Sequence, residues 1–124
     1  MQKIILLTAS AFGALSVMIG AFGAHALRAT LEAQGRLETF ETAVKYQFYH
    51  TLALLAIGLL MYKISDKLLG YAGYSMIGGV LIFSGSLYIL CLSGIRWLGA
   101  ITPIGGVLII VGWALLFWAV ARSL

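Results

Sequence analysis

The chain has 124 residues, of which 62% are hydrophobic and 10% are charged. Soluble domains average roughly 45–50% apolar and about 25% charged residues, so this composition excludes an ordinary soluble globule and indicates a protein surrounded by lipid. The net charge of +4 comes from basic residues that stand singly at the ends of apolar runs, where they meet headgroup phosphates. Because no basic stripe with interleaved aromatic residues is present, we expect no nucleic-acid partner.

The first apolar run predicts a membrane-spanning helix at 4–25. Between Lys3 and Arg28 lie 24 residues without a permanent charge, and a helix needs about 20 apolar residues to cross the hydrocarbon core. The sequence AHA at 24–26 matches a signal-peptide cleavage site, but the run is far longer than the roughly 7–15 residues of a signal-peptide core. We therefore expect this segment to be retained as a span.

The polar stretch RATLEAQGRLETFETAVK at 28–45 predicts a short interfacial helix between the first two spans. Gly35 is expected to divide the stretch. Glu41 and Lys45 stand four residues apart in the order that stabilises a helix, so the part after Gly35 is expected to bend or continue into the second span.

Three further uncharged runs predict spans at 42–62, 69–92 and 103–121. These runs are continuously apolar, which favours helices over the alternating strands of a membrane barrel, and Pro103 fits the first turn of the last helix. The links between them are short, so consecutive helices should be antiparallel neighbours. The predicted fold is an all-α integral membrane four-helix bundle with up-down-up-down topology, a single domain over 1–124.

The basic residues favour a cytoplasmic location for both termini. Each side of the predicted bundle has four of them, but those on the side of the termini lie tight against the span ends, and the terminal amine adds to them. The side of the termini carries Lys3, Lys63, Lys67 and Arg122, whereas the other side carries Arg28, Arg36, Lys45 and Arg96.

Small residues recur at spacings that suit close helix packing. Lipid tails are as apolar as leucine, so helices in a membrane associate through close backbone approach. We interpret these positions as packing faces, within the chain or between copies in a homo-oligomer. They are Gly13, Ser16 and Gly20 in the first span, Gly78, Gly79 and Gly85 in the third, and Gly105, Gly106 and Gly112 in the fourth.

A few polar side chains fall in the same half of the predicted bundle, on the side of the 28–45 segment. Polar groups at this depth should face the bundle interior and bond to one another. We expect Ser84 and Ser86 to bond back to their own helix, Cys91 to fill core space, and Trp113 to pack or contact lipid. The candidate polar cluster comprises His25, Gln47, His50, Tyr88 and Thr102.

The two histidines leave several readings open. His50 is expected to be a neutral side chain bonded to Gln47, to Tyr88 or to a backbone carbonyl, with a proton relay or a ligand role as the alternative. His25 is expected to contact water, headgroups or the 28–45 segment. As a pair they could clamp a haem, but two histidines are too few for a zinc site, so we expect no metal and no cofactor.

Four blocks in order along the chain are similar to one known family. These blocks are GAFGAHAL at 20–27, YQFYHTLAL at 46–54, FSGSLY at 83–88, and TPIGG at 102–106 followed by GW at 112–113. They resemble the family that includes bacterial YgdD and YwdK and the eukaryotic transmembrane protein 256. The resemblance implies a small four-span protein of the bacterial plasma membrane, with no known substrate, cofactor or catalytic residue to transfer.

The sequence is compatible with three hypotheses about function. No carboxylate lies within a span and no nucleophile–base set is evident, so catalysis is not expected. The first hypothesis is a non-catalytic protein that acts by association with itself, with the lipid bilayer or with another membrane protein. The alternatives are a small dimeric transporter or channel with His50 in a proton or ligand role, and a redox protein with haem between the two histidines.

Overall fold

The structure, a computed structural model, describes residues 1–124 as helices joined by short turns, without strands. Four segments are long and apolar enough to cross a membrane, which confirms the predicted all-α membrane bundle. The elements are α1 (Gln2–Ala24), α2 (Arg28–Ala33), α3 (Leu37–Leu60), α4 (Lys67–Ser93), the short 3₁₀ helix η1 (Arg96–Ala100) and α5 (Thr102–Ser123).

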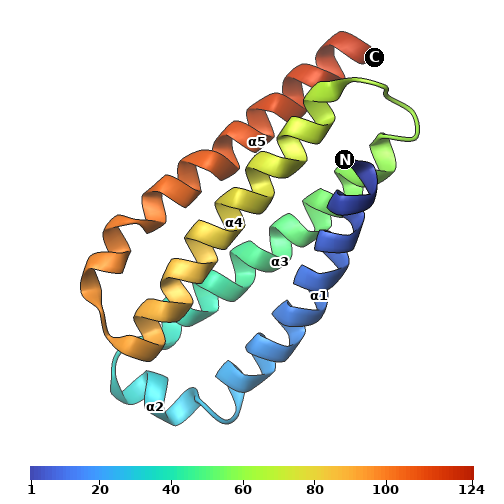
Figure 1. Cartoon of the computed structure of the whole chain (residues 1–124). Helices are drawn as coiled ribbons and strands as arrows, with labels where there is room; N and C mark the ends of the chain where they lie inside the picture. The colour runs from blue at the N-terminus through green and yellow to red at the C-terminus, as the bar shows by residue number, and fades with distance from the viewer.

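The four long helices run antiparallel to their neighbours in the chain (Figure 1). Both termini and the α3–α4 turn lie at one end of the bundle, whereas α2 and η1 lie at the other. The main packing partners are α1 with α3, α3 with α4, and α4 with α5. As a result α1 and α5 are the outer helices. In the most apolar 18-residue stretch of each span, 22% is buried in the spans of α1 and α5, against 44% in α3 and 39% in α4.

The polar segment between α1 and α3 folds back onto the bundle. Gly35 divides it in a left-handed conformation with a φ of +67°, which favours glycine. After this turn α3 begins at Leu37 and continues without a break into the second span, so the helix begins five residues before the predicted start at 42. On the other side of the turn, Leu31 of α2 packs in a small cluster with Phe40 and Cys91, which fastens α2 to the bundle.

The closest helix contact joins α4 to α5. A Cβ atom placed on Gly79 would lie 2.8 Å from the backbone nitrogen of Ile109 and 2.9 Å from the carbonyl oxygen of Gly105. A Cβ on Gly112 would lie 3.1 Å from the carbonyl oxygen of Ala72. Backbone therefore meets backbone along this seam, as expected where helices pack in lipid without a hydrophobic driving force.

The other small residues predicted to pack differ in how closely they are approached. On α1, Gly13 faces the methyl group of Thr51, and Gly20 faces Val44, each 3.3 Å from the position of an added Cβ. Ser16 is buried and donates to the carbonyl of Phe12 in its own helix, at 2.7 Å. Looser surroundings are found at Gly78 and Gly106, where the nearest atom is 3.9 Å away, and at Gly85, where nothing lies within 4 Å. Closely packed glycines outside the prediction are Gly23, Gly58, Gly70 and Gly73.

An ion pair closes the end of the bundle that carries the termini. Asp66 caps α4 by accepting from the backbone N–H of Leu68 at 2.9 Å. The Arg122 guanidinium donates to both oxygens of this carboxylate, at 2.6 and 2.7 Å. The bonds from Arg122 have the largest effect and the bond from Leu68 the next largest, and together they lower the pKa of Asp66 to about 2. The carboxylate therefore remains charged at any physiological pH.

We predict that Gly79→Ala destabilises the protein and that Gly78→Ala does not. The new methyl group at 79 would press on α5 backbone, which no side-chain rotation relieves, so the expected loss is about 1–3 kcal/mol. At 78 the space is open, and alanine favours a helix by up to about 1 kcal/mol. Thermal unfolding in detergent can be followed by a thiol-reactive dye, because Cys91 is the only cysteine and is 2% exposed. Equal melting temperatures for the two variants would contradict the seam.

Candidate functional site

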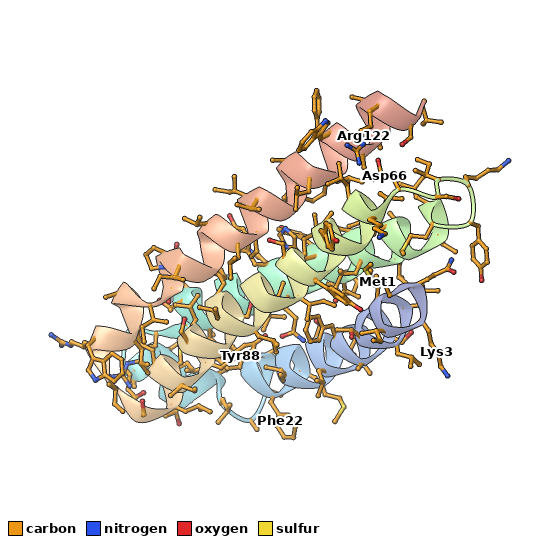
Figure 2. The ribbon with its side chains drawn as sticks, turned by 45° about the horizontal axis from the view of Figure 1, so that its top comes forward. Met1, Lys3, Phe22, Asp66, Tyr88 and Arg122 are labelled. Carbon is orange, nitrogen blue, oxygen red and sulfur yellow. The ribbon has the colours of Figure 1, made fainter.

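A buried amide joins three helices in the half of the bundle remote from the termini. Gln47 of α3 is only 4% exposed. Its Nε2 donates to the carbonyl of Phe12 on α1 at 3.0 Å, and its Oε1 accepts from the hydroxyl of Tyr88 on α4 at 2.6 Å. Figure 2 places Tyr88 well away from Met1, Asp66 and Arg122. Gln47 is therefore the centre of the polar cluster.

Hydroxyl groups extend this network along the helices. Thr51 donates to the backbone carbonyl of Gln47 at 2.8 Å. Ser84 donates to the carbonyl of Ala43 at 2.7 Å, across from α4 to α3, so the expectation that it bonds within its own helix is wrong. Ser86 meets the Thr102 hydroxyl at 2.6 Å and also the carbonyl of Phe83 in its own helix at 2.9 Å. Side-chain bonds thus join α3 to α4 and α4 to α5 at this depth.

His50 lies one turn further along α3 and bonds on both sides of its ring. Its Nδ1 lies 2.7 Å from the backbone carbonyl of Tyr46, and its Nε2 accepts from the indole N–H of Trp113 at 2.9 Å. The carbonyl can only accept, and the indole can only donate. This pair of partners assigns the neutral tautomer with the proton on Nδ1. His50 therefore bonds to a backbone carbonyl, which was one of the alternatives left open by the sequence.

Trp113 has a larger part in this network than the sequence suggested. The sequence predicts only packing or lipid contact for this side chain, yet its N–H donates to His50 and so joins α5 to α3. The two rings meet edge to face, with centroids 5.8 Å apart. The signal that could have found this bond is the indole itself, because its N–H requires an acceptor wherever water is absent.

His25 lies outside the cluster. It follows the last turn of α1, is exposed, and borders a surface hollow with Met18, Phe22 and two alanines of the same segment. No side-chain hydrogen bond links it to Gln47 or to the rest of the network. The two histidines thus have different surroundings, because His50 is turned toward α5 and already uses both ring nitrogens. This arrangement does not form the paired ligand set that a haem between them would need.

A groove of about 200 Å³ lies between α1 and α4 and is bordered by the central amide. Its lining is mostly apolar, with Phe12, Leu15 and Ile19 on the α1 side, and it also includes Gln47 and Tyr88. Gly85 lines the same groove, which explains why a Cβ there would touch nothing. The groove therefore offers apolar contact to a lipid acyl chain.

No three His, Cys, Asp or Glu residues come together anywhere in the structure in a group that could hold a metal ion.

Comparison with known proteins gives the chain a family. Residues 19–106 match the family described as Protein of unknown function (DUF423). No solved structure is significantly similar to the chain.

Three relatives illustrate the range of similarity. A UPF0382 membrane protein of Staphylococcus saprophyticus is 51% identical over 108 residues, which cover 84% of this chain and 88% of the relative. The UPF0382 membrane protein YwdK of Bacillus subtilis is 39% identical over 128 residues, covering 99% and 100%. The UPF0382 inner membrane protein YgdD of Escherichia coli is 36% identical over 121 residues, covering 98% and 92%. With four membrane-crossing helices and relatives aligned over almost its whole length, the chain belongs to the DUF423 (UPF0382) family of membrane proteins of unknown function.

Proposed function

We propose that the protein is a non-catalytic component of the bacterial plasma membrane that works by associating with copies of itself or with another membrane protein. One observation carries this proposal. The buried polar side chains of the spans are bonded inside the bundle, and no buried side-chain nitrogen or oxygen lacks a partner. What the protein offers to other molecules within the hydrocarbon is therefore the outer surface of its helices.

His50 illustrates why proton or ligand chemistry is the weaker reading. A proton added to Nε2 would place two donors face to face and break the bond from Trp113. A ligand on that nitrogen would displace the indole and leave its N–H without an acceptor, which costs free energy in an apolar medium. The His50 imidazole and the Trp113 indole are therefore best understood as a bond between helices. In that case His50 has no free nitrogen for the proton or ligand role that the transporter and haem hypotheses require.

The outer faces of α1 and α5 support the association reading. On α5, Ile110 is 68% exposed and Phe117 is 78% exposed. Both side chains therefore lie away from α4, which is the helix that packs extensively on α5. The outer face of α1 places the small residues Ser10, Ala14 and Ala21 among larger apolar ones. Small residues at such positions allow a second helix to approach closely.

We further propose that both termini lie in the cytoplasm. At the end with the termini, Lys3, Lys63 and Lys67 have no ion pair. At the other end Arg28 pairs with Glu32 at 3.0 Å, and Arg36 bonds to backbone and side-chain oxygens of the protein itself. Arg36, Lys45 and Arg96 at that end likewise have no ion pair, so each end keeps three unpaired cations. Those beside the termini lie close to helix ends, with Lys3 and Lys67 in the first turns of α1 and α4. Cytoplasmic segments are the ones that carry an excess of lysine and arginine near the ends of the spans, which supports this orientation.

The first prediction from this proposal concerns His50 and Trp113. If their bond is structural, Trp113→Phe and His50→Leu should each lower stability, and the double variant should lose less than the sum. The expected coupling is about 0.5–1.5 kcal/mol, the range found for hydrogen bonds between membrane helices. Unfolding in a titration with a denaturing detergent measures all four proteins. Fully additive losses would contradict the bond. A pH-dependent flux in proteoliposomes that His50→Leu abolishes would favour the transporter hypothesis instead.

The second prediction tests association directly. In a Cys91→Ser background, Ala14→Cys on α1 and Ala114→Cys on α5 place single thiols on the outer faces. Mild oxidation in native membranes should give disulfide-linked dimers, or mixed disulfides with a partner, from at least one of them. The unmodified chain is the matched control, because its only cysteine is buried and should not cross-link. If both variants stay monomeric, and purification in mild detergent yields a bare monomer, the proposal fails.

The third prediction tests orientation. In the same cysteine-free background, Ser65→Cys lies in the α3–α4 turn and Ala33→Cys lies at the end of α2, and both positions are exposed. A membrane-impermeant thiol reagent added to intact cells should label position 33 and spare position 65 until the membrane is opened. Labelling of position 65 from outside would reverse the assignment.

A further inference from the structure

We infer that the end of the bundle beside the termini binds the phosphate of an anionic phospholipid headgroup. The site is an open pocket of about 550 Å³ between the α3–α4 turn and the last turn of α5. It is lined by residues 63–67 together with Arg122 and Ser123, of which only Ile64 is hydrophobic.

The charges of this pocket match an anion. Lys63, Lys67 and Arg122 line it with a single acid, Asp66. The acid is already engaged, since it accepts both bonds of Arg122 and the N–H of Leu68. The side chain of neither lysine has a hydrogen bond or an ion pair within the protein. Two free ammonium groups therefore flank the pocket, and their charge has no partner in the chain.

The geometry of Arg122 prepares the site further. Its Nε and Nη2 are held by Asp66, while its other N–H groups remain free to donate, and the side chain is half exposed. A guanidinium fixed in this way loses little freedom when it contacts a phosphate oxygen. Ser65 and Ser123 add hydroxyl groups to the same lining. Charge-assisted bonds from such donors are the strong ones in phosphate recognition.

The depth of the pocket favours a lipid over a phosphate in solution. Trp118 lies one helical turn below Arg122, which stands over its ring at 5.3 Å, and Tyr71 lies one turn below Lys67. Both aromatic side chains are about half exposed, at 55% and 50%. Exposed tryptophan and tyrosine mark the membrane–water interface, so the groups one turn beyond them lie at the level of headgroup phosphates. Figure 2 shows Arg122 and Asp66 together at this end of the bundle.

This inference does not rest on the proposed association through α1 and α5. The pocket is formed by the turn and by polar groups at the end of α5, whereas association uses apolar faces along the helices. Native mass spectrometry separates the two questions, because one spectrum reports the number of protein copies and the number of lipids bound to each assembly.

The experiment offers the full-length protein in mild detergent an equimolar mixture of dioleoyl phosphatidylglycerol and dioleoyl phosphatidylcholine. The first lipid is anionic and the second carries no net charge. The test variant is Lys63→Gln with Lys67→Gln. The matched control, Lys45→Gln with Arg96→Gln, removes the same charge from the opposite end of the bundle. Melting of each variant, followed at Cys91, verifies that the fold is retained.

We expect the wild-type protein to retain phosphatidylglycerol in preference to phosphatidylcholine. The test variant should lose about 25-fold in apparent affinity for phosphatidylglycerol, since each basic residue near an anionic surface contributes about a fivefold factor. The control variant should bind as the wild type does. Absence of a preference in the wild type, or an equal loss in both variants, would overturn the inference. So would displacement of the lipid by an equal amount of inorganic phosphate, which would identify a site for free anions.

Discussion

The absence of water from the hydrocarbon core constrains every polar group in this protein. A side chain that can donate or accept must find its partner within the bundle, because lipid offers none. Gln47 meets this requirement by bonding to α1 and α4 at the same time. Since both ends of its amide are used, the register of the three helices around it is defined. Ser84 meets the same requirement by donating to the carbonyl of Ala43 on α3.

The attachment of α5 follows from this constraint as well. Its main packing partner is α4, so polar bonds at several depths supplement the glycine seam. Thr102 bonds to Ser86 near one end, Trp113 bonds to His50 midway, and Arg122 bonds to Asp66 at the other end. Helices that gain nothing from hiding apolar surface in lipid are held by such contacts. The opposite face of α5 is left bare, and so is most of α1.

The sequence predicts what depends on local composition and much less of what depends on orientation around a helix axis. The number of spans, the short helix after α1 and the division at Gly35 follow from charge-free runs and from turn chemistry. The orientation of each helix about its own axis cannot be predicted in this way, because apolar residues occur on all sides of the four long helices. For this reason the partners of Ser84 and Trp113 and the outward position of His25 emerge only when the helices are packed.

The glycines make the same point. Gly78 and Gly79 are identical neighbours in the sequence, yet only Gly79 lies on the seam with α5. A rotation of about 100° per residue separates the two, and no pattern of charge around them indicates which one faces inward. Gly85 has the spacing of a packing residue but opens a groove instead.

The two ends of the bundle differ in a way that composition alone conceals. Each end has four basic residues, but at the α2 end Arg28 and Arg36 are turned back onto the protein. At the other end Asp66 accepts from Arg122 and from the N–H of Leu68, and the lysines there have no ion pair. The placement of lysine and arginine influences how a bundle is oriented in a membrane, and clustered basic residues attract anionic headgroups. The basic residues of the two ends thus differ in their arrangement: Lys63, Lys67 and Arg122 line one pocket with a single acid, whereas Glu32, Glu38 and Glu41 accompany those of the α2 end.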